Sequence, residues 1–158
     1  MRFYTLSPIG NEGASDNGPP AIRVVRVTLP GEIDRSQLVQ RIDSNRLQLA
    51  EDDRWAAPLG EMIQRTLFAD LQSRVPAVAS DPDQLSVEIE EFIGEASCAV
   101  TLRATWNLKP SQATVKSIRG YESIRVEPTR ACQVSALPEG MSRALAELSN
   151  RVASARTK

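Results

Sequence analysis

The most regular pattern in the sequence lies at residues 97–108, which read SCAVTLRATWNL. Alternate positions carry an apolar side chain or a cysteine: Cys98, Val100, Leu102, Ala104, Trp106 and Leu108. Most positions between them are polar: Ser97, Thr101, Arg103, Thr105 and Asn107. This alternation is typical of a strand that has one buried face and one face open to water. The stretch therefore predicts a half-buried strand in a sheet.

A second predicted strand, residues 114–126, returns antiparallel after the turn sequence at residues 109–112. We expect paired residue numbers in this hairpin to sum to about 223, which places Cys98 opposite Arg125. Cys132 then lies just beyond the end of the strand. If the chain is exported, Cys98 and Cys132 can form one disulfide closing a loop of about 35 residues, worth roughly 3–4 kcal/mol by chain-entropy arguments. Two separate buried thiols are the alternative.

The remaining strands are shorter. Residues 85–92 alternate until Glu90-Glu91, where the change of phase predicts a bulge, and a turn is expected at residues 94–96. The valines of residues 22–29 point both ways, which predicts a strand covered on both faces or at a sheet interface. Further strands are predicted at residues 2–6, 36–42 and 46–50, the last two as a hairpin around Asp43-Ser44-Asn45.

Two amphipathic helices complete the pattern. The first starts near Trp55, carries Pro58 in its first turn and ends at Val75-Pro76. Its apolar stripe consists of Leu59, Met62, Ile63, Leu67 and Leu71. The second covers residues 137–155, with Met141, Leu145, Leu148 and Val152 on one side. Together the elements predict an α+β fold, a two-layer sandwich in which two helices pack on one face of an antiparallel or mixed sheet.

Composition excludes several classes of function. The chain has 158 residues, a formal net charge of −1, two cysteines and no histidine. We expect residues 1–158 to form a single domain, with a flexible loop at residues 8–21. The near-neutral charge argues against nucleic-acid binding, and the lack of histidine excludes Ser–His triads and histidine-based metal sites. The sequence contains neither a signal peptide nor an apolar run of the about 20 residues that span a membrane, so the chain is either cytoplasmic or the mature part of an exported protein.

Candidate chemical groups are few. Residues 51–54 form a dense charged run, which we interpret as a solvated loop leading into a helix. Glu88, Glu90 and Glu91 form a carboxylate group that we also interpret as solvated surface. Trp55 either seals one end of the core or marks an exposed interaction surface. The sequence thus predicts no catalytic residue, no metal ligand and no cofactor site.

Several segments occur together in a specific order: Phe3–Leu6, Val24–Pro30, Ile33–Val39, Arg46–Glu51, Arg54–Leu59 and Met141–Ser149. This series resembles the PqiC-like family, the auxiliary lipoproteins of MCE-type ABC transport systems. The resemblance extends over nearly the whole chain. The positions that match the family motifs, for which we expect structural or interface roles, are Pro30, Asp34, Arg35, Trp55, Pro58 and Leu59.

The resemblance implies a periplasmic domain tethered by lipid to the outer membrane and working with an inner-membrane MCE-domain protein and an ABC permease. Such a protein is not an enzyme; it supports envelope integrity and the movement of lipid or other hydrophobic cargo between membranes, in some members as a homo-oligomeric ring. Family precursors carry a signal peptide that ends in a lipidated cysteine. This chain has neither, and we expect that segment to lie just before Phe3. The alternative function is a periplasmic domain that binds a small ligand or peptidoglycan.

Overall fold

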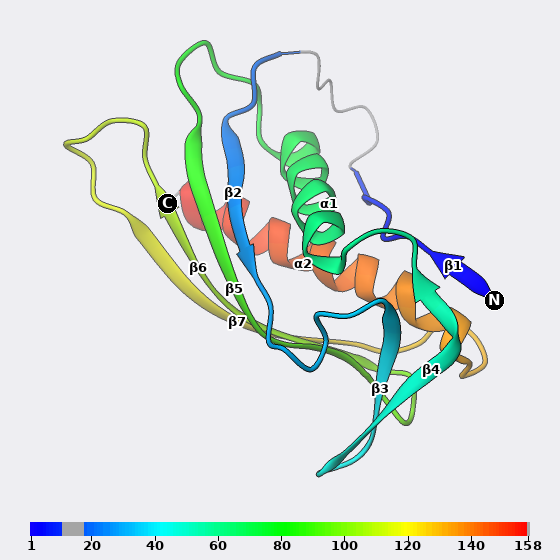
Figure 1. The fold of residues 1–158 in the computed structure, drawn as a ribbon. Coiled ribbons are helices and arrows are strands. Elements are labelled where there is room, and N and C mark those ends of the chain that lie inside the picture. Colours follow the sequence, from blue (N-terminus) through cyan, green and yellow to red (C-terminus); the bar gives the residue numbers. More distant parts are fainter. Residues whose placement is uncertain (11–17, 158) are drawn as a thin grey trace.

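A mixed seven-stranded sheet and two long helices form two layers in the computed structural model, which describes residues 1–10 and 18–157 (Figure 1). The strands are β1 (Arg2–Tyr4), β2 (Ile22–Thr28), β3 (Gln37–Asp43), β4 (Arg46–Trp55), β5 (Asp83–Glu95), β6 (Val100–Lys109) and β7 (Ile118–Val126). The helices are α1 (Leu59–Arg74) and α2 (Leu137–Arg156), the latter preceded by a short 3-10 turn, η1 (Val134–Ala136). The predicted α+β class is confirmed. Much of the loop expected at residues 8–21 lies outside the described residues.

The order of strands across the sheet is β1-β4-β3-β5-β6-β7, and β2 also pairs with β5. The long strand β5 is antiparallel to β6 along one edge. Its other edge is shared: β2 runs parallel to its first half, and β3 runs parallel to its last residues, where Gln40 pairs with Gly94. The sheet therefore divides into a β2–β5–β6–β7 part and a β1–β4–β3 part (Figure 1).

Both helices cover the same face of the sheet. Helix α1 packs on β2 and on α2, whereas α2 crosses β5, β6 and β7. Alternation in β6 buries Leu102 and Ala104 completely, and Leu67 of α1 and Leu148 of α2 are equally inaccessible. Neither α1 nor α2 covers the opposite face of β2, β5, β6 and β7 (Figure 1). The two helices thus leave one broad sheet face open.

The predicted charged loop at residues 51–54 is wrong, because these residues belong to β4. The parallel pairing of β1 with β4 places Arg2 beside Asp53 and Tyr4 beside Trp55, so a distant segment extends the strand. Helix α1 consequently begins later than predicted, at Leu59, with Pro58 as its N-cap residue. Its predicted end is confirmed, since Arg74 is the last helical residue.

The predicted register of the long hairpin is also wrong. Val100 pairs with Val126 and Leu108 with Ile118, because the turn after Lys109 is longer than the sequence suggested. Cys98 is therefore not a strand residue opposite Arg125; it lies in the β5–β6 turn with a φ of 67°.

The predicted bulge in β5 is confirmed between Ile89 and Glu91. The turn expected at residues 94–96 is displaced, however, because Gly94 still pairs with Val100 and with Gln40. The expectation for β2 is wrong at Val25, which lies at a bulge and is 41% exposed, since helices cover only one face of the sheet.

Gly120 of β7 allows Trp106 of β6 to pack across the neighbouring strand. A Cβ atom on Gly120 would lie 2.4 Å from Cε2 of the Trp106 ring, and Trp106 is only 4% exposed. We expect Gly120→Ala to lower the free energy of unfolding by about 1–3 kcal/mol, because a buried ring must move. Urea denaturation measures this change. Gly31→Ala is the control, since no atom lies within 4 Å of its added Cβ; an equal loss in both variants would contradict the packing argument.

Candidate functional site

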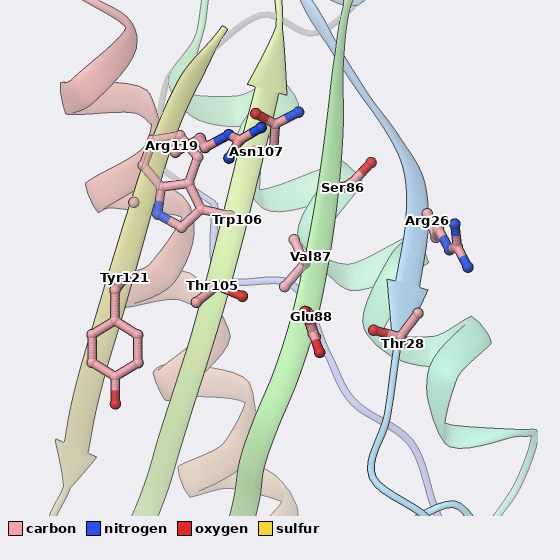
Figure 2. Close-up of a pocket in the computed structure, with 11 residues that line it drawn as sticks. Arg26, Thr28, Ser86, Val87, Glu88, Thr105, Trp106, Asn107, Arg119 and Tyr121 are labelled. Atoms are coloured by element: carbon pink, nitrogen blue, oxygen red, sulfur yellow. The ribbon is translucent and has the colours of Figure 1, made fainter.

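The uncovered sheet face carries a hollow of about 880 Å³ over β2, β5, β6 and β7 (Figure 2). Pairing between the strands fixes which side chains stand beside one another on this face. One row across the four strands consists of Arg26, Ser86, Asn107 and Arg119, each paired in register with the next. We call this space the open-face hollow.

The next row of the open-face hollow runs parallel to the first. It consists of Thr28, Glu88, Thr105 and Tyr121, which are again paired in register. Tyr121 is 53% exposed and stands at the β7 side of the hollow (Figure 2). The hollow therefore offers guanidinium groups, a carboxylate, an amide and hydroxyls on a rigid sheet.

The charges in the hollow lack ion-pair partners among the described residues. Within residues 1–10 and 18–157, Arg26, Arg119 and Glu88 form no ion pair. The Oδ1 atom of Asn107 lies buried beneath these groups and has no hydrogen-bond partner among the described residues. The exposed side chains of Arg26, Glu88 and Arg119 are therefore the groups that an external ligand can reach.

Charges farther along the same face are neutralised instead. Glu91 binds Arg103 at 2.7 Å and Arg41 at 3.4 Å between nitrogen and oxygen. Glu91 and, to a smaller extent, the Tyr121 hydroxyl raise the pKa of the Arg103 guanidinium. Arg125 is paired with Glu95 and Glu127. The predicted solvated carboxylate group is thus split, because Glu91 is engaged in ion pairs and Glu88 faces the hollow.

The motif positions predicted from the sequence lie elsewhere, and none of them lines the hollow. Trp55 and Leu59 are 5% and 2% exposed and line a small gap together with Ile33. The backbone oxygen of Pro30 accepts a hydrogen bond of 3.2 Å from the Ile33 amide, which closes the turn. Pro58 caps α1, whereas the side chains of the two charged motif positions, Asp34 and Arg35, are exposed. Trp55 therefore belongs to the core, so its side chain offers no exposed interaction surface.

A disulfide joins Cys98 and Cys132, whose Cα atoms lie 5.4 Å apart. It links the β5–β6 turn to the segment that leads into α2, across 34 positions of the sequence. Cys98 is 3% exposed. The bond therefore ties the helix layer to the end of the sheet.

The N-terminal strand is held by a buried carboxylate that the sequence did not reveal. Asp53 is 5% exposed; Arg2 donates to its two oxygens at 2.8 and 3.0 Å, and the Tyr4 hydroxyl donates at 2.7 Å. The Arg2 hydrogen bonds lower the pKa of Asp53, and the bond to Asp53 raises the pKa of Tyr4. The group is structural: it fastens β1 to β4.

A second buried carboxylate, Asp70 of α1, holds the segment that follows β1. The Ile9 amide donates to Asp70 Oδ1 at 2.7 Å, and the Arg74 guanidinium donates to the Ile9 oxygen at 2.7 Å. Asp70 is completely buried, and burial raises its pKa to about 6, against the lowering effects of the Ile9 amide and Arg74. The chain near the N-terminus is thus bound to the helix layer at residue 9.

The described part of the chain contains no group of three or more potential metal ligands among its cysteine, aspartate and glutamate side chains. No helix there is both long and apolar enough to cross a membrane.

Comparisons with known proteins agree on one family. The sequence model of the family described as "ABC-type transport auxiliary lipoprotein component" matches residues 4–153. The chain is 25% identical over 134 residues to the intermembrane transport lipoprotein PqiC of Escherichia coli K12, covering 79% of this chain and 72% of that protein. The PqiC of Shigella flexneri matches equally.

Two crystal structures share the fold. One, of an uncharacterised protein, superposes with a TM-score of 0.78 at 20% identity and covers 96% of this chain and 95% of that one. The other, of a protein from Xanthomonas campestris, gives a TM-score of 0.65 at 17% identity, over 96% and 92% of the two chains. At these identities the likeness concerns the fold alone.

Proposed function

Because the chain belongs to the family of ABC-type transport auxiliary lipoprotein components, we propose that it is a non-catalytic, outer-membrane-tethered part of an MCE-type system that moves lipid or other hydrophobic cargo between membranes. The match to the family over residues 4–153 is the observation that carries this proposal. The related PqiC of Escherichia coli is itself named an intermembrane transport lipoprotein. In this proposal the protein supports envelope integrity from the periplasm.

The way the N-terminal segment is held supports a tether at that end. Asp53 fastens β1, and Asp70 with Arg74 fastens residue 9 to the helix layer. A lipid attached ahead of β1 would therefore be joined to a segment that is itself fastened to the folded domain. The disulfide between Cys98 and Cys132 is typical of an oxidising compartment such as the periplasm.

The absence of a catalytic role rests on chemistry. The chain has no histidine, and each of the buried aspartates Asp53 and Asp70 holds the N-terminal segment. We propose that the protein acts by binding, with an inner-membrane MCE-domain protein and the ABC permease as partners and with the homo-oligomer as its working form.

Co-purification tests the partner. The domain, with a C-terminal tag and its disulfide intact, is mixed with the purified periplasmic part of the MCE-domain protein from the same genome. We expect a complex on size-exclusion chromatography whose mass also reports the number of copies of this chain. Each protein chromatographed alone is the control. Elution of the two native proteins as separate species would contradict the proposal.

The open-face hollow favours a second candidate function, a periplasmic domain that binds a small ligand. This second candidate can be distinguished from the transport function by measurement. Such a domain would bind its ligand as a monomer, in the absence of any MCE-domain protein. The same alternative includes a domain that binds peptidoglycan. Binding of peptidoglycan fragments to the monomer would test it.

A further inference from the structure

We propose that the open-face hollow binds a small zwitterionic phosphate compound, with the phosphate on Arg26 and Arg119 and the ammonium group on Glu88. The hollow, of about 880 Å³, has the volume of a small-molecule site. It is built on four paired strands, which fix the spacing of its residues along and across the sheet. This inference deepens the small-ligand alternative given above and is independent of the transport proposal.

The two arginines frame the place for the phosphate. Arg26 and Arg119 stand at the two ends of one row, on strands that are three steps of about 4.8 Å apart. Each long side chain has to reach over only one neighbouring strand to meet an anion above Ser86 and Asn107. Figure 2 shows the Arg119 guanidinium leaning over β6 beside Asn107, whereas the Arg26 guanidinium lies on the side of β2 away from β5 and has to turn across β2 to meet the anion. Guanidinium groups donate several hydrogen bonds to phosphate oxygens, and the Ser86 hydroxyl supplies another donor.

The carboxylate of Glu88 selects a zwitterion over a simple anion. Glu88 follows Ser86 by two positions on β5, which places both on the same face about 7 Å apart. Its carboxylate forms no ion pair among the described residues and would repel a plain anion. An ammonium group a few bonds from the phosphate pairs with the exposed Glu88 carboxylate while the phosphate pairs with the arginines.

The ligand of the hollow is a dissolved compound. A sheet face that binds a lipid bilayer would carry different side chains. A face that lies on a membrane exposes several large apolar side chains next to its cationic groups. Among the strongly exposed large hydrophobic side chains of the described residues, only Tyr121 lines the hollow; most others, such as Phe3 and Leu47, belong to elements that contribute nothing to it. The hollow is also concave and carries a carboxylate, which suits a small ligand.

Isothermal titration of the folded protein with glycerophosphoethanolamine tests the proposal. We expect saturable binding by the wild type and a loss of about tenfold or more in affinity for Arg26→Gln and for Arg119→Gln. Arg65→Gln, which removes the same charge from α1 outside the hollow, is the matched control and should bind as the wild type does. Thermal unfolding checks that each variant is folded, and Arg119→Lys should restore part of the affinity.

Glu88→Gln separates the two ligand classes. It should weaken the binding of glycerophosphoethanolamine and strengthen that of inorganic phosphate, because it removes both the ammonium partner and the repulsion of an anion. The proposal is overturned if the wild type does not bind glycerophosphoethanolamine at millimolar concentration, or if the arginine variants bind as the wild type does. Equal effects of Glu88→Gln on both probes, or binding only to phosphatidylethanolamine vesicles, would overturn it as well.

Discussion

Replacing both cysteines, Cys98→Ala together with Cys132→Ala, is expected to lower the free energy of unfolding by about 4 kcal/mol. The bond spans 34 positions, and removing it restores the conformational freedom of that loop to the unfolded chain. For a chain of this size the loss corresponds to a fall in melting temperature of about 8–15 °C. Scanning calorimetry under non-reducing conditions measures both quantities.

Reduction provides the control for this prediction. Wild-type protein in excess dithiothreitol should melt close to the double variant, and dithiothreitol should leave the variant itself unchanged. Alkylation of unreduced protein, first native and then unfolded in denaturant, should label neither cysteine. Labelling of both cysteines, or equal melting with and without reductant, would show that the bond is not formed.

The second large effect is a pH dependence that originates at Asp70. Its pKa is raised from 3.8 to about 6 in the folded protein, so the folded state keeps a proton that the unfolded state releases. This contribution to stability is therefore present at acidic pH and is lost as the pH rises through about 6. We expect the free energy of unfolding of the wild type, relative to Asp70→Asn, to fall by about 2 kcal/mol between about pH 4 and about pH 8.

Asp70→Asn isolates this group because the amide keeps the acceptor oxygen for the Ile9 amide and cannot titrate. Urea denaturation of both proteins across the pH range gives the difference directly. Asp53 does not interfere in this window, since its pKa is lowered from 3.8 and its contribution is lost only at more acidic pH. A constant difference between the two proteins at every pH would contradict the buried, protonated Asp70.

Local patterns in the sequence were enough to predict the two-layer fold. Three local patterns each predicted one structure, and each prediction is confirmed. They are the alternation in residues 100–108, which predicted a strand, the phase change at Glu90-Glu91, which predicted a bulge, and the apolar stripes of the two helices. Two of the errors lie where distant segments meet. β1 extends β4 through Asp53, and Gly94 pairs with both β3 and β6, and neither contact leaves a periodic signal.

The open-face hollow was beyond sequence analysis for a similar reason. The polar positions of β6 were evident, but the row of Arg26, Ser86, Asn107 and Arg119 depends on the register of three strand pairs. The predicted register of the β6–β7 hairpin was shifted by an odd number of residues, which exchanges the two faces of a strand. Only the correct pairing places Arg119 and Tyr121 on the open face.

The envelope of the organism that carries this gene provides the most direct test of the proposed role. Sensitivity to detergent is measured in a deletion strain, in the same strain carrying the full-length gene, and in a strain lacking the MCE-domain protein. The transport proposal predicts raised sensitivity in both deletions, no further increase when they are combined, and restoration by the full-length gene. Unchanged sensitivity in the deletion strain, with no complex between the two purified proteins, would contradict it.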